Sequence, residues 1–135
     1  MRKMIIASHD KMAFGVKSTI DFITNHSFDV YEISAYTEGV DLEKDIANLI
    51  QSFSRDDQVI ILTDMLSGSV NQQILNYRND HINVIAGFNL PLALEILLFP
   101  QDHQLSEDDL LRLIENSKQQ IQLVQDAPIT FDGDE

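Results

Sequence analysis

A run of five apolar or β-branched residues, Val59-Ile60-Ile61-Leu62-Thr63, constrains the fold more than any other feature of the chain. Such a run, without alternation of polar and apolar residues, is typical of a strand in a parallel sheet whose two faces are both covered by helices. Polar residues follow at once, because Asp64 ends the run and Ser67-Gly68-Ser69 has the composition of a turn. The run therefore predicts a central strand that leads into a polar loop.

The rest of the chain alternates between short apolar segments and segments with helical periodicity. Strands are expected at 4–7, 28–33, 59–63 and 82–86, and helices at about 12–23, 42–53, 70–77, 90–99 and from residue 110 onward. Asp41, Ser69 and the segment 106–109 are expected to cap three of these helices. Strands and helices that alternate through short connections predict an α/β fold. We expect a doubly wound, four-stranded parallel sheet in the order 2-1-3-4, with helices on both faces.

The length of the chain indicates one domain. Its 135 residues, of which 44% are hydrophobic, suit one packed core. We expect the domain to span residues 1–125 and residues 126–135 to form an acidic tail. Within the domain, Gln120 to Val124 is expected to form a short strand after the last helix.

Composition excludes several classes of function. The chain has no cysteine, which excludes disulfides and thiolate chemistry, and its net charge of −13 argues against nucleic acid as a partner. No apolar run reaches the roughly 18 residues that a membrane span needs, so a cytoplasmic protein is expected. The sequence contains neither a nucleotide-binding glycine loop nor a metal-ligand spacing, and we expect no cofactor and no metal.

Ligands of open α/β sheets bind at the carboxyl ends of the strands, and this rule selects the candidate residues. They are Ser8, His9 and Asp10 after the first strand, Tyr36 and Thr37 after the second, Asp64, Ser67, Gly68 and Ser69 after the third, and Gly87, Phe88 and Asn89 after the fourth. In the expected strand order the first and third strands are neighbours. His9 and Asp64 are therefore expected to face each other, whereas His26, His81 and His103 are expected to face solvent.

The pairing of His9 with Asp64 favours phosphoryl transfer. An aspartate that accepts a hydrogen bond from one imidazole nitrogen leaves the other nitrogen nucleophilic, and its charge stabilises the ring once it is phosphorylated. Ser67, Gly68 and Ser69 lie at an expected helix start, where backbone N–H groups and hydroxyls suit a phosphoryl group. A receiver domain also has an aspartate after its third strand. It needs clustered acidic residues after its first strand, and Ser8-His9-Asp10 supplies one carboxylate.

Three segments, in the same order, resemble the signature segments of the mannose-family IIA domains of the bacterial phosphoenolpyruvate-dependent sugar phosphotransferase system. They are Ile5–His9, Leu62–Ser69 and Val84–Pro91, and the resemblance extends over roughly residues 1–125. It implies that His9 is the phosphorylated histidine, that Asp64 is its partner, and that Gly68 and Ser69 bind the phosphoryl group. The departures are Asp10 and Ser67, where the family often has glycine, and Val70 in place of proline.

The resemblance also implies partners. The donor is the histidine-phosphorylated carrier protein, the acceptor is a IIB domain, and the sugar enters through the membrane components IIC and IID. Members of the family are homodimers that exchange a C-terminal strand, here residues 120–124. Two alternatives remain open: a phosphotransfer subunit of dihydroxyacetone kinase, which uses the same histidine, and a non-enzymatic regulator that is modified at His9.

Overall fold

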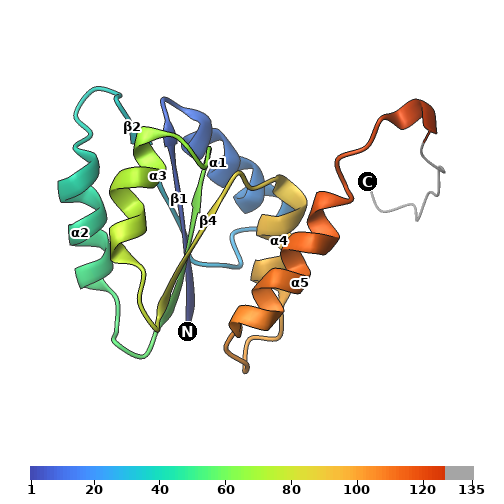
Figure 1. Ribbon diagram of the computed structural model, residues 1–135. Helices are drawn as coiled ribbons and strands as arrows, with labels where there is room; N and C mark the ends of the chain where they lie inside the picture. Colours follow the sequence, from blue (N-terminus) through green and yellow to red (C-terminus); the bar gives the residue numbers. More distant parts are fainter. Residues whose placement is uncertain (127–135) are drawn as a thin grey trace.

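A four-stranded parallel sheet in the order β2-β1-β3-β4 forms the centre of the molecule (Figure 1). The computed structural model describes residues 1–126. The strands are β1 (Arg2–His9), β2 (Val30–Ala35), β3 (Gln58–Thr63) and β4 (Ile82–Ala86). The expected α/β fold, strand order and parallel pairing are confirmed.

Helices cover both faces of the sheet. α1 (Met12–Thr24), α4 (Leu90–Leu98) and α5 (Glu107–Lys118) pack on one face, and α2 (Leu42–Ser52) and α3 (Ser69–Ile74) pack on the other (Figure 1). Two short 3₁₀ turns, η1 (Leu75–Tyr77) and η2 (Val124–Asp126), complete the elements of residues 1–126. No helix in this part of the chain is both long enough and apolar enough to cross a bilayer.

The core has two halves because successive strand residues point to opposite faces. In β1, Met4 and Ile6 pack with α1, α4 and α5, whereas Ile5 and Ala7 pack with α2 and α3. All six residues of β3 are buried. The apolar run that predicted a central strand is thus apolar because it contributes to both halves of the core.

Three of the four strands are followed directly by a residue with a left-handed backbone. These residues are Asp10 (φ 52°), Tyr36 (φ 67°) and Gly87 (φ 76°). The Asp10 N–H donates to the Ala35 carbonyl at 2.8 Å, and the Gly87 N–H donates to the Thr63 carbonyl at 2.9 Å. The chain therefore turns out of neighbouring strands at the same level, which brings their loops together at the carboxyl edge of the sheet.

The expected helix caps are confirmed in two cases and wrong in one. The Asp41 carboxylate accepts a hydrogen bond from the Lys44 N–H, and Ser106 and Asp109 form a capping box before α5. Ser69 was expected to cap α3, but Gly68 occupies the N-cap position and Ser69 is the first residue of the helix. The reason is that the Ser69 side chain turns toward Tyr36 instead of toward its own helix.

The expected strand at 120–124 does not form within the single chain. Residues 121–123 have no regular secondary structure, and η2 begins at Val124. The segment leaves the end of α5 in a direction away from the sheet (Figure 1), and a strand needs a neighbour for its backbone hydrogen bonds. Residues 127–135 of the expected acidic tail lie outside the described residues.

The left-handed backbone at Asp10 generates a stability prediction. A β-branched side chain tolerates this conformation poorly, so Asp10→Val should lower the free energy of unfolding by about 1–2 kcal/mol. Asp10→Gly should change the free energy of unfolding by less than about 1 kcal/mol, because glycine adopts this conformation without strain. Urea denaturation of the three proteins measures both effects.

The neighbouring residue provides the control for this prediction. Lys11 is also exposed but has φ −90°, so Lys11→Val adds the same side chain where the backbone accepts it. An equal loss of stability in Lys11→Val and Asp10→Val would contradict the role of the backbone conformation.

Candidate active site

His9 and Asp64 meet at the carboxyl edge of the sheet, as the strand order predicts. His9 is the last residue of β1, and Asp64 directly follows β3. The ring nitrogen Nδ1 of His9 lies 2.7 Å from Oδ2 of Asp64, and the backbone N–H of His9 donates to the same oxygen, also at 2.7 Å. One carboxylate oxygen therefore fixes both the backbone and the ring of the histidine.

The environment of Asp64 keeps its carboxyl group ionised. Its side chain is 8% exposed, and this burial on its own raises the pKa. The backbone and ring hydrogen bonds from His9, together with the charge of the ring, act in the opposite direction and outweigh burial, so the pKa lies below its ordinary value. When the ring is neutral, the ionised carboxylate favours the proton on Nδ1, where Asp64 accepts it, and Nε2 keeps its lone pair.

Nε2 lies on the open side of the ring, beside the start of α3. The His9 side chain is 37% exposed, and the Ser69 hydroxyl lies 3.4 Å from Nε2. Gly68 packs against the same ring, because a Cβ atom at this position would lie 3.2 Å from Cε1 of His9. Ser67 is exposed in the turn that precedes Gly68. Glycine at position 68 thus allows α3 to approach the imidazole closely.

Tyr36 completes the group of side chains around His9. Its hydroxyl lies 2.6 Å from Oγ of Ser69, and its ring centroid lies 5.5 Å from that of the imidazole, at an interplanar angle of 44°. The sequence placed Tyr36 among the candidates only because it follows a strand. No motif indicated its contact with Ser69, because the two residues are 33 positions apart.

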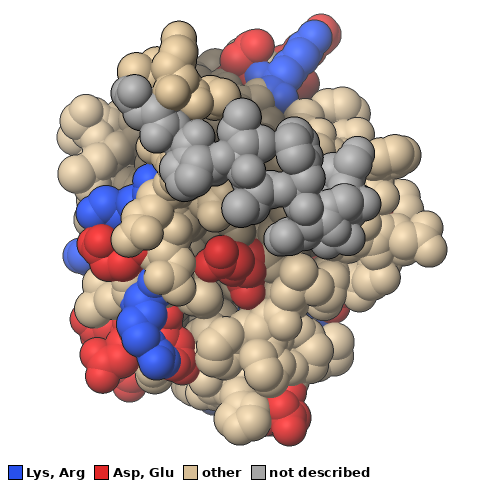
Figure 2. Space-filling view, turned by 90° about the vertical axis from the view of Figure 1, so that its right-hand side faces the viewer, with Lys and Arg blue, Asp and Glu red and all other residues tan. Residues whose placement is uncertain are grey.

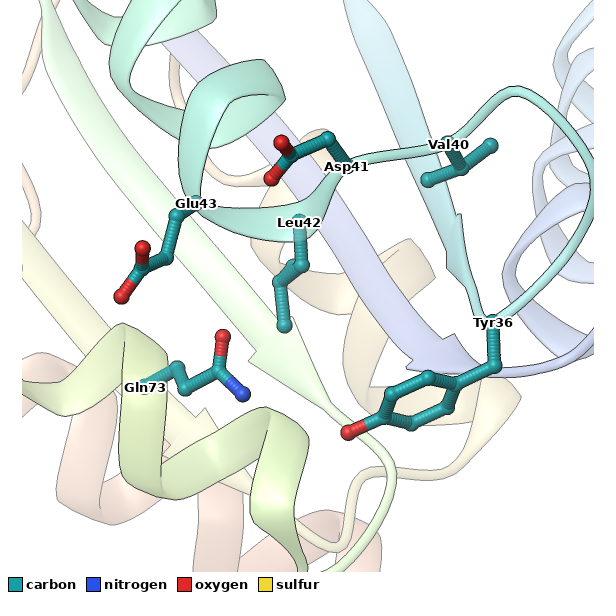
Figure 3. Close-up of a pocket in the computed structure, with 6 residues that line it drawn as sticks. All are labelled: Tyr36, Val40, Asp41, Leu42, Glu43 and Gln73. Carbon is teal, nitrogen blue, oxygen red and sulfur yellow. The ribbon is translucent and has the colours of Figure 1, made fainter.

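An open cleft of about 590 Å³ borders this site through Tyr36 (Figure 3). Its lining residues come from the end of β2, the start of α2 and α3: Tyr36, Val40, Asp41, Leu42, Glu43 and Gln73. The two carboxylates have a structural explanation, since Asp41 caps α2 and Glu43 lies in its first turn, where the helix dipole favours negative charge. The cleft lies beside His9 and does not contain it.

Several other candidates direct their side-chain hydrogen bonds to the loops and not to His9. The Ser8 side chain is buried, and its hydroxyl accepts a hydrogen bond from the Ala13 N–H at 2.7 Å. The Thr37 hydroxyl donates to the Ser34 carbonyl within the turn after β2. Asn89 caps α4 and also donates to the Ser117 carbonyl at the end of α5. These side chains hold the ends of helices and turns.

Asn71 is a supporting residue that the sequence did not indicate. Its side chain is buried, accepts a hydrogen bond from the Thr63 hydroxyl at 2.8 Å and donates to the Leu66 carbonyl at 2.9 Å. These bonds tie α3 to both ends of the segment that contains Asp64. An asparagine within an amphipathic helix gave no signal for this role.

The three histidines other than His9 are exposed. His26, His81 and His103 all face solvent, as expected. Within residues 1–126, no three His, Asp or Glu side chains are grouped in a way that could hold a metal ion.

The arrangement around His9 provides a nucleophilic nitrogen, an anionic partner for the ring and a hydroxyl next to the reacting atom, which together suit transfer of an anionic group.

A family model described as EIIA-man, PTS system fructose IIA component, matches residues 3–112. A solved structure described as a candidate phosphoenolpyruvate-dependent sugar phosphotransferase system permease, from Klebsiella pneumoniae subsp. pneumoniae, is 29% identical with a TM-score of 0.81. That match covers 93% of this chain and 92% of the other.

Two streptococcal structures are also similar. The phosphotransferase system component EIIA from Streptococcus agalactiae is 25% identical with a TM-score of 0.76, and the match covers 94% of this chain and all of the other (100%). The PTS IIA protein associated with the fucose utilization operon of Streptococcus pneumoniae shares the fold, at 23% identity and a TM-score of 0.77, with 92% and 93% of the two chains covered.

The family match includes the whole site. It begins in β1 and ends in α5, so it contains all four strands together with His9, Asp64 and the start of α3. It covers well over half of the 135 residues. The chain therefore belongs to the EIIA-man family, the IIA components of the mannose and fructose type in the sugar phosphotransferase system.

Proposed function

We propose that this IIA component carries a phosphoryl group on Nε2 of His9. It accepts the group from the histidine-phosphorylated carrier protein and passes it to a IIB domain. The observation that supports this most strongly is the hydrogen bond between Nδ1 of His9 and the buried Asp64 carboxylate, at 2.7 Å, because it leaves Nε2 as the nucleophile on the exposed side of the ring.

Bonds and charges balance in this transfer without a base or a metal. The lone pair of Nε2 forms a bond to phosphorus while the bond between phosphorus and the donor's imidazole nitrogen breaks, and its electron pair stays with the donor. The His9 ring, which keeps its proton on Nδ1, becomes positively charged, and the donor ring loses its positive charge. The Asp64 carboxylate stabilises the charge that develops on His9.

Ser67, Gly68 and Ser69 bind the phosphoryl group in this proposal. The Ser69 hydroxyl, 3.4 Å from Nε2, is close enough to donate to a phosphoryl oxygen once the new bond has formed. Gly68 lets the backbone lie against the ring, and Ser67 is accessible beside it. Asp10, exposed directly after His9, adds negative charge near the incoming group.

The partners and the location follow from the same reaction. The similar Klebsiella structure, which is described as a sugar phosphotransferase system permease, favours a IIB domain as the acceptor over a dihydroxyacetone kinase subunit. The membrane components IIC and IID take part indirectly, when the IIB domain phosphorylates the incoming sugar. Residues 1–125 form the phosphotransfer domain, and it works in the cytoplasm, where the carrier protein is phosphorylated.

A labelling experiment tests the proposed function. The chain is incubated with phosphoenolpyruvate, enzyme I and the carrier protein, and the label is mapped by mass spectrometry under alkaline conditions that preserve phosphohistidine. We expect one label, on His9, that disappears in His9→Ala and persists in His26→Ala, whose histidine is exposed and lies near Asp21, not near Asp64. Label that survives in His9→Ala would exclude His9 as the acceptor.

Replacement of the carboxylate tests the role of Asp64. Asp64→Asn keeps the shape of the side chain and removes its charge, so the rate of phosphoryl transfer to His9 should fall by about 10²–10⁴-fold, the range of orienting and acid–base groups. The control is Asp56→Asn, which removes a charge from an exposed loop. Equal transfer rates in Asp64→Asn and the parent would show that the carboxylate is not required.

The close contact at Gly68 leads to a prediction about orientation. In Gly68→Ala the new methyl group meets Cε1 of His9 at 3.2 Å and Cε of Met65 at 3.3 Å, and the ring must shift by a few tenths of an ångström. Transfer should slow by about three- to tenfold, because misplacement of a reacting group by about 1 Å can cost 10²-fold. Gly15→Ala, on α1, is the matched control, since nothing lies within 4 Å of its added methyl group. Loss of rate in both variants would contradict this explanation.

A homodimer that exchanges residues 120–124 is part of the proposal. Ile121, Leu123 and Val124 are 73%, 66% and 68% exposed in the single chain. Seen from the side of α4 and α5, much of the visible surface is uncharged although the net charge of the chain is −13 (Figure 2). β4 is an edge strand, and pairing with a segment of a second copy satisfies its free backbone groups.

Light scattering tests the dimer. The full chain should have twice the mass of the 15.4 kDa monomer at micromolar concentration. Removal of residues 119–135 should give a monomer, whereas removal of residues 127–135 alone should leave the dimer intact. A monomeric full chain, or a dimer that survives the longer truncation, would contradict the exchange.

A further inference from the structure

Tyr36 lies close to the reacting nitrogen, although no sequence motif assigns it a role. Its hydroxyl is 2.6 Å from Oγ of Ser69, which in turn lies 3.4 Å from Nε2 of His9. Figure 3 shows the Tyr36 side chain reaching from the end of β2 toward α3, with the hydroxyl at its tip. Three residues from the ends of three segments thus form one polar chain that ends at the proposed phosphoryl acceptor.

One arrangement of protons satisfies all the hydrogen bonds that link Asp64, His9, Ser69 and Tyr36. In the neutral ring with its proton on Nδ1, facing the Asp64 carboxylate, Nε2 can only accept a hydrogen bond. The Ser69 hydroxyl therefore donates toward Nε2, and its oxygen is left to accept the proton of the Tyr36 hydroxyl. The direction of each bond follows from the ionised carboxylate at the other side of the ring.

Packing does not explain the position of Tyr36. The residue is 62% exposed, so burial of its ring contributes little to holding it in place. Its backbone has φ 67°, which a non-glycine residue rarely adopts, and such conformations gather at functional sites. The turn is held from both sides, because the Asp10 N–H donates to the Ala35 carbonyl and the Thr37 hydroxyl donates to the Ser34 carbonyl.

We infer that Tyr36 is a positioning residue for phosphoryl transfer at His9 and acts through the hydroxyl of Ser69. The inference rests on the proposed function. A serine hydroxyl on an exposed helix start has several staggered positions available. The hydrogen bond from the Tyr36 hydroxyl selects the position in which the Ser69 hydroxyl faces Nε2. When phosphorus bonds to Nε2, the Ser69 proton turns to a phosphoryl oxygen, and Tyr36 continues to donate to Oγ and keeps the serine in place.

The test is Tyr36→Phe, which removes the hydroxyl and keeps the ring. The rate of phosphoryl transfer to His9 at saturating phosphorylated carrier should fall by about three- to tenfold, the effect of one neutral hydrogen bond. The carrier concentration that gives half the maximal rate should change little, because the exposed ring is retained. Tyr77→Phe, at the far end of the α3–η1 segment, is the matched control and should transfer at the parent rate.

A double-mutant cycle separates positioning through Ser69 from an independent effect. Ser69→Ala should slow transfer more than Tyr36→Phe, and the double variant should be no slower than Ser69→Ala alone. The inference would be overturned if Tyr36→Phe transferred at the rate of the parent. It would also be overturned if the fold-loss of rate in the double variant equalled the product of the losses in the two single variants. Urea denaturation measures the free energy of unfolding of each variant. Values close to that of the parent show that the variants compared are folded.

A second donor distinguishes failure of this inference from failure of the proposed function. Phosphoramidate, a small donor that phosphorylates histidine directly, requires no protein partner, and modification of His9 is followed by mass mapping. If the carrier labels none of the proteins but phosphoramidate still modifies Tyr36→Phe three- to tenfold more slowly than the parent, the inference holds and the proposed function fails. If both donors label the parent and Tyr36→Phe at equal rates, the inference fails and the function stands.

Discussion

The carboxylate of Asp64 is the group on which the site depends. One of its oxygens accepts hydrogen bonds from both the backbone N–H and the ring of His9, at 2.7 Å each. This double contact requires the ends of β1 and β3 to be neighbours, and their register, in which Ala7 pairs with Thr63, brings Asp64 level with Ser8, one residue before His9. The ring orientation thus depends on the pairing of these two strands.

The surrounding loops are held by bonds that have no direct part in chemistry. Asn71 ties α3 to the segment around Asp64, Ser8 holds the start of α1, and Asn89 joins α4 to α5. The segment Val84–Pro91, one of the three that resemble the family, builds the connection from β4 to α4, whereas the hydrogen bonds to the His9 ring come from Asp64 and Ser69. Residues that identify the family are therefore partly residues that shape its scaffold.

The sequence predicted the fold and the central pair because both depend on simple periodic patterns. The apolar run at 59–63 required helices on two faces, and the strand order then placed His9 opposite Asp64. It did not predict the contact of Tyr36 with Ser69, since that contact depends on a left-handed turn that no local pattern indicates at a tyrosine. Ser69 was expected to cap α3 because serine commonly does, but here a tertiary contact outweighs the local preference. The alternation at 120–124 indicated a strand, yet alternation alone supplies no neighbour for it to pair with.

The separation of the site residues along the chain has a consequence for folding. His9 lies 55 positions from Asp64 and 60 from Ser69, so a chain in which only β1 and α1 have formed carries the histidine without its carboxylate or its hydroxyl. During synthesis His9 leaves the ribosome long before β3 does. In the proposed reaction His9 therefore becomes a competent acceptor only when the central strand has entered the sheet, and an incompletely folded chain would not withdraw phosphoryl groups from the carrier.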